Sequence, residues 1–568
     1  MTNTESHIQN TDTRGSGLQL AKIALVAIAF LVVLTISLGW LNATLPSGSV
    51  AKHAIDVENN SISLAISQEP PQMNSMRTTD AVSGMLLGHV KEGLIRHGPD
   101  NQLIPGVAKS WDLHELGGTF HLRHDAYWSN GTRVTAHDFV FAWQTALKPA
   151  TASPYSFILY PLKNALEINK GELEADTLGA VAVDDFTLEV SLARPAPHLL
   201  ALFAFFTYLP VNQEFYESTD GNYGSDADMM IYNGPFKITS WLHARSLRLE
   251  KNEYYWASER TKLDAIDFPH MVSDPNTTLN LFATNKIALA GLDLQNIQRA
   301  LNNRWEIKDH IDGSVWYLTF NLREDRITSN RNLRKAIQMV TDPHELVYKV
   351  YRIPGNIPGA SIFPVWLKGV NGMFRDEFPA PTHVPDVELA LEYLEAAKSE
   401  LGLDKIPSLV FLCGDSPTSD KQAQYYQNLF KKNLDIDIKI DKQIFKQRLA
   451  KSEAGEFDIV AGGWGPDYDD VLTFGDLFAS WNDNNRGKFH NEELDNAVRI
   501  AENSLDQQER MEAMDVVQQV LYEEAPIIVE MERGSVYVID ERLKGVSRRS
   551  VGIDPDYTRA YIDVDSSE

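Results

Sequence analysis

Cysteine is almost absent from this 568-residue chain, and the only one is Cys413. A single cysteine excludes a disulfide within the chain and every metal cluster built from several cysteines. The chain also lacks a run rich in Lys and Arg, and its formal net charge is −26. Because such a surface repels phosphate backbones and anionic lipid headgroups, we expect no nucleic-acid partner.

Catalytic and cofactor-binding motifs are missing as well. His114 and Glu115 begin like a zinc-protease motif, but Gly118 stands where the second His is needed. We find no phosphate loop, no dinucleotide-binding fingerprint and no Gly-x-Ser-x-Gly nucleophile elbow. The sequence therefore predicts a protein that is not an enzyme and that carries neither a metal nor a cofactor.

One long uncharged stretch is present, at residues 23–41. As a helix with a rise of 1.5 Å per residue it would be roughly 28 Å long, close to the ~30 Å hydrocarbon core of a membrane. Arg14 and Lys22 precede the stretch, which favours an N-terminus inside the cell and the bulk of the chain outside. We therefore interpret residues 1–19 as a cytoplasmic leader, 20–41 as a transmembrane anchor or uncleaved signal, and 42–61 as a tether.

A cleaved signal peptide is the alternative for this stretch, with Ala43 as the cleavage site. The apolar core of a signal peptide has about 7–15 residues, so this run is longer than expected for one. No cysteine follows the run to carry a lipid, which excludes a lipid-anchored bacterial lipoprotein.

The remaining residues, about 520, carry signals for both strands and helices and suggest more than one lobe. In the first half, alternating apolar residues predict strands and hairpins, as in an α+β arrangement. In the second half, helices and strands alternate, which favours a partly parallel α/β sheet. The spacing predicts strands over 119–123, 185–190, 236–238, 246–250, 408–412, 436–440 and 457–460, and helices over 136–143, 387–401 and 421–434.

Four motifs in a fixed order resemble those of solute-binding protein family 5, the peptide-binding proteins that serve ABC importers. The resemblance runs from about residue 62 to 565, and residues 151–155 are similar to the oligopeptide-binding branch. The first motif covers residues 105–111, 119–123, 126–131 and 134–140; the second 233–237 and 249–256; the third 321–322, 333–337 and 342; the fourth 457–468.

The resemblance implies an α/β fold, α+β in part: a two-lobed periplasmic-binding-protein type II fold with an extra domain, preceded by one transmembrane helix. It divides the chain into a discontinuous lobe I (62–91, 217–317 and 535–568), an extra domain inserted in it (92–216) and lobe II (318–534). We expect a monomer that captures oligopeptides by lobe closure and delivers them to the permease subunits of an ABC importer. It would work on the periplasmic or extracytoplasmic face, anchored to the inner (cell) membrane by its N-terminal helix.

Two alternatives share this fold. One is a membrane-anchored sensor that signals its captured ligand to a membrane partner, which an uncleaved anchor favours and the very short leader disfavours. The other is a binder of a non-peptide amine. A gene neighbourhood with permease and ATPase genes would favour import.

The candidate binding site is the glycine-rich turn after the strand at 457–460, because ligands of α/β lobes lie outside the carboxyl ends of strands. The resemblance implies that Asp467 pairs with the α-ammonium group of a peptide, although an Asp here also caps turns. Trp464 would form a wall of a side-chain pocket, with a core position as its alternative. Tyr468, Tyr155 and Phe445 complete the predicted ligand-binding set.

The chain departs from the family at the other end of the ligand. Well-studied oligopeptide binders use basic side chains to hold the peptide's carboxylate, and in register the positions here are Ser419, Ser452 and Ala461, with Glu324 or Asp325 in place of a Lys. The ligand would then be a longer peptide with its end in solvent, a peptide fixed elsewhere, or a different cationic amine.

Overall fold

A computed structural model describes residue 25 and residues 53–98 and 102–564. Apart from Leu25, the predicted anchor therefore lies outside the described residues and stays a prediction. Within those residues, no helix combines the length and the apolar character that crossing a membrane requires. The described residues from His53 onward belong to one compact unit.

A five-stranded sheet holds the beginning of this unit together with a later part of the chain. Its order is β1-β2-β11-β10-β9, and only the β2–β11 pair is parallel. The predicted hairpin is confirmed as β9 and β10. The strands are β1 (Ile55–Asp56), β2 (Ser61–Ile66), β9 (Phe236–Leu242), β10 (Ser246–Lys251) and β11 (Ala265–Met271), and α2 (Ala81–Val90) lies nearby.

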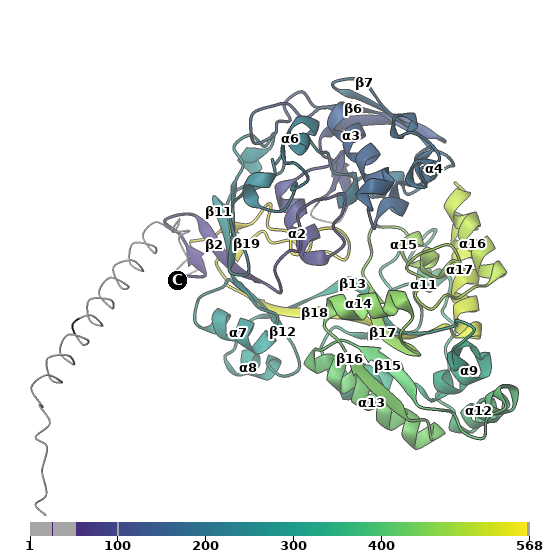
Figure 1. Cartoon of the computed structure of the whole chain (residues 1–568). Helices are drawn as coiled ribbons and strands as arrows, with labels where there is room; N and C mark the ends of the chain where they lie inside the picture. The colour runs from purple at the N-terminus through teal and green to yellow at the C-terminus, as the bar shows by residue number, and fades with distance from the viewer. Residues whose placement is uncertain (1–24, 26–52, 99–101, 565–568) are drawn as a thin grey trace, which may run out of the picture. The chain divides into compact units, whose positions relative to one another are not determined.

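The segment predicted as the extra domain contains an antiparallel sheet of order β5-β6-β8-β7 (Figure 1). Thr135 caps α3 (Ala136–Leu147) through a capping box with Asp138, as the sequence predicts. Trp128 and Trp143 are fully buried here and therefore belong to the core. The other elements are β3 (Ile95–His97), β4 (Leu103–Pro105), β5 (Ala108–His114), β6 (Gly117–Leu122), β7 (Ala180–Asp184), β8 (Thr187–Ser191), α4 (Ala165–Asn169), α5 (Leu199–Leu202) and α6 (Gln213–Ser218).

A seven-stranded mixed sheet organises the rest of the chain. Its order is β12-β18-β13-β17-β15-β16, with β14 added beside β18. The strands are β12 (Leu289–Leu292), β13 (Ile307–Phe320), β14 (Ile357–Pro358), β15 (Leu409–Cys413), β16 (Ile438–Lys442), β17 (Ile459–Trp464) and β18 (Ile527–Ile539). The longer helices are α7 (Pro275–Ala283), α9 (Arg331–Val340), α12 (Val387–Leu401), α13 (Pro417–Leu434), α14 (Phe445–Ala454), α16 (Glu492–Asn503) and α17 (Gln507–Glu524).

The two longest strands, β13 and β18, form an antiparallel pair. Their register shifts between Ile311 and Val315 and again between Trp316 and Tyr317. The predicted boundaries of lobe II, after residues 317 and 534, fall inside these two strands. The pairing of β13 with β18 therefore spans the predicted boundary, and two register shifts interrupt it there.

The connections around β15, β16 and β17 place α13 and α14 on opposite faces of the sheet. β15 is parallel to both β16 and β17 and lies between them. The crossover through α13 moves outward to β16, and the crossover through α14 moves back past β15 to β17. Because parallel crossovers are right-handed, opposite directions require opposite faces. The N-terminal turn of α14 consequently lies at the carboxyl ends of the strands.

The predicted elements of this region are confirmed with small shifts. α12 matches its predicted bounds, whereas β15, β16 and β17 each begin one or two residues later than predicted. The shift at β16 arises because the Ile436 N–H still caps the end of α13 by donating to Phe430. At its other end α13 begins at Pro417, four residues early, because Ser416 caps the helix and proline suits its first position.

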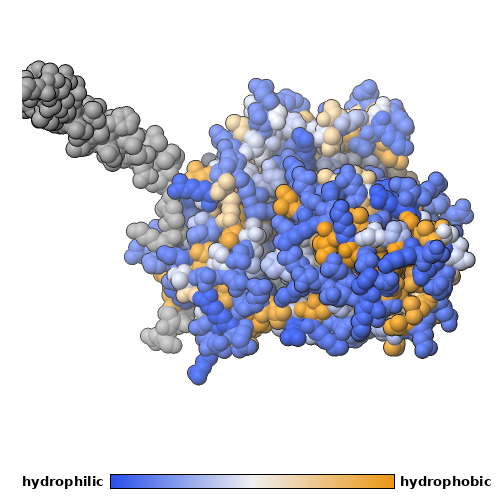
Figure 2. Space-filling view, turned by 60° about the horizontal axis from the view of Figure 1, so that its bottom comes forward, coloured by the Kyte–Doolittle hydropathy of each residue, from blue (hydrophilic) through white to orange (hydrophobic). Residues whose placement is uncertain are grey.

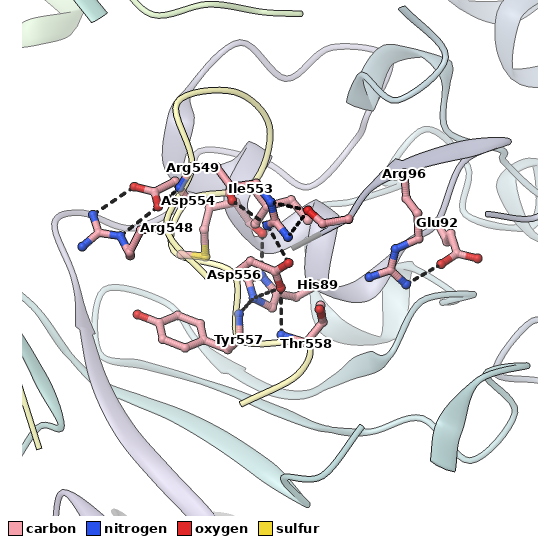
Figure 3. Close-up of polar contacts among 12 residues, drawn as sticks. His89, Glu92, Arg96, Arg548, Arg549, Ile553, Asp554, Asp556, Tyr557 and Thr558 are labelled. Carbon is pink, nitrogen blue, oxygen red and sulfur yellow. Dashed lines mark hydrogen bonds and ion pairs between the residues drawn. The ribbon is translucent and has the colours of Figure 1, made fainter. Parts of the chain in front are cut away.

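Residues 548–558, near the C-terminus, are held in place by buried ion pairs (Figure 3). Arg549 lies 2.6 Å from Asp556, and the His89 ring accepts the Tyr557 N–H at 2.9 Å. Burial alone raises the pKa of Asp556, but Arg549 and His89 outweigh it and hold the pKa at about 2. Arg548 and Asp554 form a similar pair beside this one.

The surface is mostly hydrophilic, with apolar residues scattered over the face shown in Figure 2. Apolar side chains instead fill three large clusters, one under each of the sheets described above. The largest cluster joins side chains of the segment 92–216 to residues near the β17 turn, among them Tyr468. This junction positions the candidate site.

Candidate functional site

The end of β17 has an open edge. On one side Gly462, Gly463 and Trp464 pair with β13, but on the other side the pairing with β15 covers only Ile459 and Val460. The last part of β17 therefore extends past β15 and leaves main-chain groups without a neighbouring strand among the described residues. Such an edge is suited to hydrogen bonding with an extended ligand.

Asp467 lies in the turn that follows β17. Its N–H donates to the Thr473 hydroxyl at 2.9 Å, which holds the turn. The Tyr155 hydroxyl, from the segment 92–216, donates to its carboxylate at 3.4 Å. Among the described residues Asp467 forms no ion pair. Burial raises the pKa of Asp467 to about 7, and the hydrogen bond from Tyr155 only partly opposes this. A desolvated carboxylate without a cation is a typical recognition group for an ammonium ion.

Two neighbouring acids, by contrast, have cationic partners. Arg510 lies 2.6 Å from Asp470, and Arg194 lies 3.2 Å from Glu502. Asp476 is also close, and its pKa is raised well above the usual range by burial, with further contributions from Glu502 and Asp467. Asp467 is therefore the acid of this group that has neither an ion-pair partner among the described residues nor a strongly suppressed charge, which favours a cationic ligand group.

The structure brings four of the five predicted residues to this junction. The Tyr155 ring contacts Phe205 and Phe206, and Tyr468 is buried with its ring stacked on His198 at 5.3 Å. Trp464 is partly buried, and its indole N–H has no hydrogen-bond partner among the described residues. Because its ring is packed in the core, Tyr468 holds the turn that follows β17 against the rest of the fold. Contact of these residues with a ligand stays a prediction.

Phe445 lies apart from those four residues. It is the first residue of α14, and its side chain is 51% exposed. Its ring lies 5.6 Å from the guanidinium carbon of Arg448 and has no described contact with Tyr155 or Asp467. Phe445 therefore marks a second part of the candidate site, at the carboxyl ends of the strands.

The sequence did not point to Arg448 as a candidate site residue. Of the positions predicted to have lost basic side chains, Ser452 and Ala461 are buried, and Ser419 lies in the first turn of α13. Glu324 and Asp325 are exposed. The Arg448 guanidinium, however, donates to the Ala461 carbonyl. The signal for finding it was helical spacing, because Arg448 follows Phe445 by three residues and precedes Ser452 by four.

Comparison with known proteins identifies the family of this chain. The family model described as bacterial extracellular solute-binding proteins, family 5, matches residues 102–486. The chain belongs to solute-binding protein family 5. Across 506 residues it is 31% identical to the oligopeptide-binding protein OppA of Bacillus subtilis, with 86% of this chain and 91% of the relative covered.

Solved structures of similar proteins share the fold as well. The substrate-binding domain of an oligopeptide ABC transporter from Bacillus anthracis has a TM-score of 0.82 and 33% identity, covering 90% of this chain and 99% of that one. OppA of Listeria monocytogenes bound to peptide has a TM-score of 0.80 and 29% identity, covering 89% and 99%. The fold is therefore shared over nearly the whole described chain.

Proposed function

We propose that this family 5 protein captures short peptides outside the cytoplasm and delivers them to an ABC importer. The observation that carries the proposal is Asp467, a partly buried carboxylate without a cationic partner among the described residues, at the junction of two parts of the fold. The names of the similar proteins, oligopeptide-binding proteins and a peptide-bound OppA, support the same ligand class.

The chemistry of recognition follows from the charges. The α-ammonium group of a peptide has a pKa of about 7.7–8.0, so near neutral pH it is mostly cationic. A charge-assisted hydrogen bond to Asp467 would hold this group. The open edge of β17 would bind the peptide main chain, which gives affinity without a choice of side chains.

The irregular pair β13–β18 is suited to the movement that such capture needs. Bending at two strands would change the distance between the lobes, and opening would separate the 92–216 side chains from the Tyr468 side of their shared cluster. Closure would be favoured because the ligand contacts both Asp467 and the Tyr155 side. The closed monomer is then what the permease subunits recognise, and residues 20–41 would keep it at the outer face of the cell membrane. The mass of the protein purified from its membrane tests whether this segment is retained.

A thermal-shift experiment tests the ligand class. The full-length protein is unfolded and refolded to remove co-purified ligand and then heated with a mixed pool of tripeptides to pentapeptides or with the same pool after N-acetylation. Free peptides should raise the melting temperature because they bind only the folded state, and acetylated peptides should not. If neither pool raises it, the ligand is not a peptide and the proposal fails.

A further inference from the structure

Arg448 lies on the face of α14 that meets the end of β17. Phe445, Arg448 and Ser452 follow one another at intervals of three and four residues, which places them on one side of the helix. Ser452 is buried at one end of this row and Phe445 is exposed at the other. The Arg448 side chain passes between them to the main chain of β17, where its Nη1 donates to the Ala461 carbonyl.

The guanidinium of Arg448 is only partly satisfied. Its Nε–H is enclosed and has no hydrogen-bond partner, and no carboxylate among the described residues forms an ion pair with it. Burial lowers the pKa of Arg448. Its basic neighbours are different, because Lys442 pairs with Asp420 and Lys451 pairs with Asp441. Arg448 is thus an enclosed cation without an anionic partner among the described residues, in a chain that has an excess of acids.

An enclosed charge without a partner is costly, and the cost is removed when a ligand supplies the opposite charge. The planar fork of Arg matches a carboxylate, which accepts two parallel N–H bonds from it. We propose that Arg448 binds the C-terminal carboxylate of a short peptide whose α-ammonium group lies on Asp467. This inference rests on the proposed function and adds a specificity-determining residue to it.

Small side chains make room for this arrangement. A Cβ added to Gly462 would lie 3.8 Å from Nη1 of Arg448, so the guanidinium lies directly against the strand. Ala461 and Ser452 are the buried residues next to it. Ala461 belongs to the apolar cluster on the α13 side of the sheet, so Arg448, from α14, reaches its main-chain carbonyl and not its side chain.

The distance between the two proposed anchors limits the peptide length. Asp467 follows Ala461, the contact of Arg448, by six residues. An extended chain advances at most about 3.5 Å per residue, so the Cα atoms of Ala461 and Asp467 are at most about 21 Å apart. An extended peptide of about three to five residues spans such a distance, and a peptide of about eight residues is too long to have both ends held.

The experiment compares carboxylate peptides with C-terminal amides. The full-length, refolded protein is titrated with the pool of tripeptides to pentapeptides and with the same pool amidated, and the concentration that gives the half-maximal thermal shift is measured. The wild type should need about 10- to 100-fold more of the amidated pool, as expected for the loss of a charge-assisted pair. Arg448→Gln should respond to both pools alike, at the wild type's amide level, and Arg448→Lys should be intermediate.

Lys446→Gln is the matched control, because Lys446 is an exposed cation on the same helix. It should keep the preference for the carboxylate pool. Equal responses of the wild type to both pools, or an unchanged preference in Arg448→Gln, would overturn the role of Arg448. The proposed function survives that result as long as N-acetylation still abolishes the shift. If no pool produces a shift, the proposed function fails and this inference fails with it.

Discussion

Asp467 and Asp556 are both enclosed carboxylates, yet their surroundings are opposite. Asp556 lies 2.6 Å from Arg549 and near His89, and its pKa is held at about 2. Asp467 receives only the Tyr155 hydroxyl at 3.4 Å, and burial raises its pKa to about 7. The comparison separates two settings of the same side chain: one acid has its cation within the fold, whereas the other has none among the described residues and is proposed to receive one from a ligand.

The largest effect is expected at the paired acid. Asp556→Asn leaves Arg549 enclosed without its anion, so the free energy of unfolding should fall by about 3–5 kcal/mol. Urea denaturation followed by fluorescence measures this. Asp435→Asn is the control, because Asp435 is exposed, pairs with lysines and has a positive φ that Asn also adopts. Equal stability of the two variants would show that the C-terminal ion pairs contribute little.

For Asp467→Asn we expect lower peptide affinity without a loss of stability. Peptide affinity should fall by about 10- to 100-fold, because the charge-assisted bond to the ammonium group is lost. The ligand-free variant should be at least as stable as the wild type, because no charge is desolvated. Titration calorimetry and thermal melts measure the two quantities. Loss of both affinity and stability would mean that Asp467 supports the turn instead of binding a ligand.

The pH dependence of Asp467 has a definite sign. Between the ordinary value of 3.8 and about 7 the folded protein keeps a proton that the unfolded chain has lost, so this group lowers the stability of the ligand-free protein as pH rises. Peptide binding needs the ionised form, so affinity should be about fivefold lower at pH 6 than at pH 7. Dissociation constants measured from pH 5 to 8 should show this slope in the wild type.

Asp467→Asn serves as the control for that slope. The buried Glu530 also has a pKa raised to about 7, and its titration contributes equally to both proteins. The difference between the two pH profiles therefore isolates Asp467. Parallel profiles would assign the slope to another group.

The smallest effect is expected for Tyr155→Phe. Its hydroxyl lies 3.4 Å from the Asp467 carboxylate, so the hydrogen bond is weak. Its loss should raise the pKa of Asp467 slightly and reduce peptide affinity about twofold. NMR titration of the carboxylate and calorimetry measure these changes. A loss as large as that of Asp467→Asn would make Tyr155 a direct contact of the ligand.

Much of the fold follows from local sequence signals, since α12 has the bounds and α3 has the N-cap that the sequence predicts. Asp467 was also predictable, because a glycine-rich turn after a strand marks the carboxyl edge of a sheet. The roles of Tyr468 and Arg448 were less accessible. Tyr468 is buried by His198, which is 270 residues away, and Arg448 is distinguished only by the absence of an acid beside it. A distant contact decides the first case and a missing partner decides the second, and composition reports neither.

The lone cysteine gives this molecule a built-in chemical reporter. Cys413 ends β15, next to the strand that bears the candidate site, and its thiol is buried with a pKa raised to about 11. A thiol reagent can modify the chain only at this position, and only while the end of β15 is transiently exposed. The labelling rate with and without peptide therefore measures how strongly a captured ligand suppresses local opening, with no engineered label.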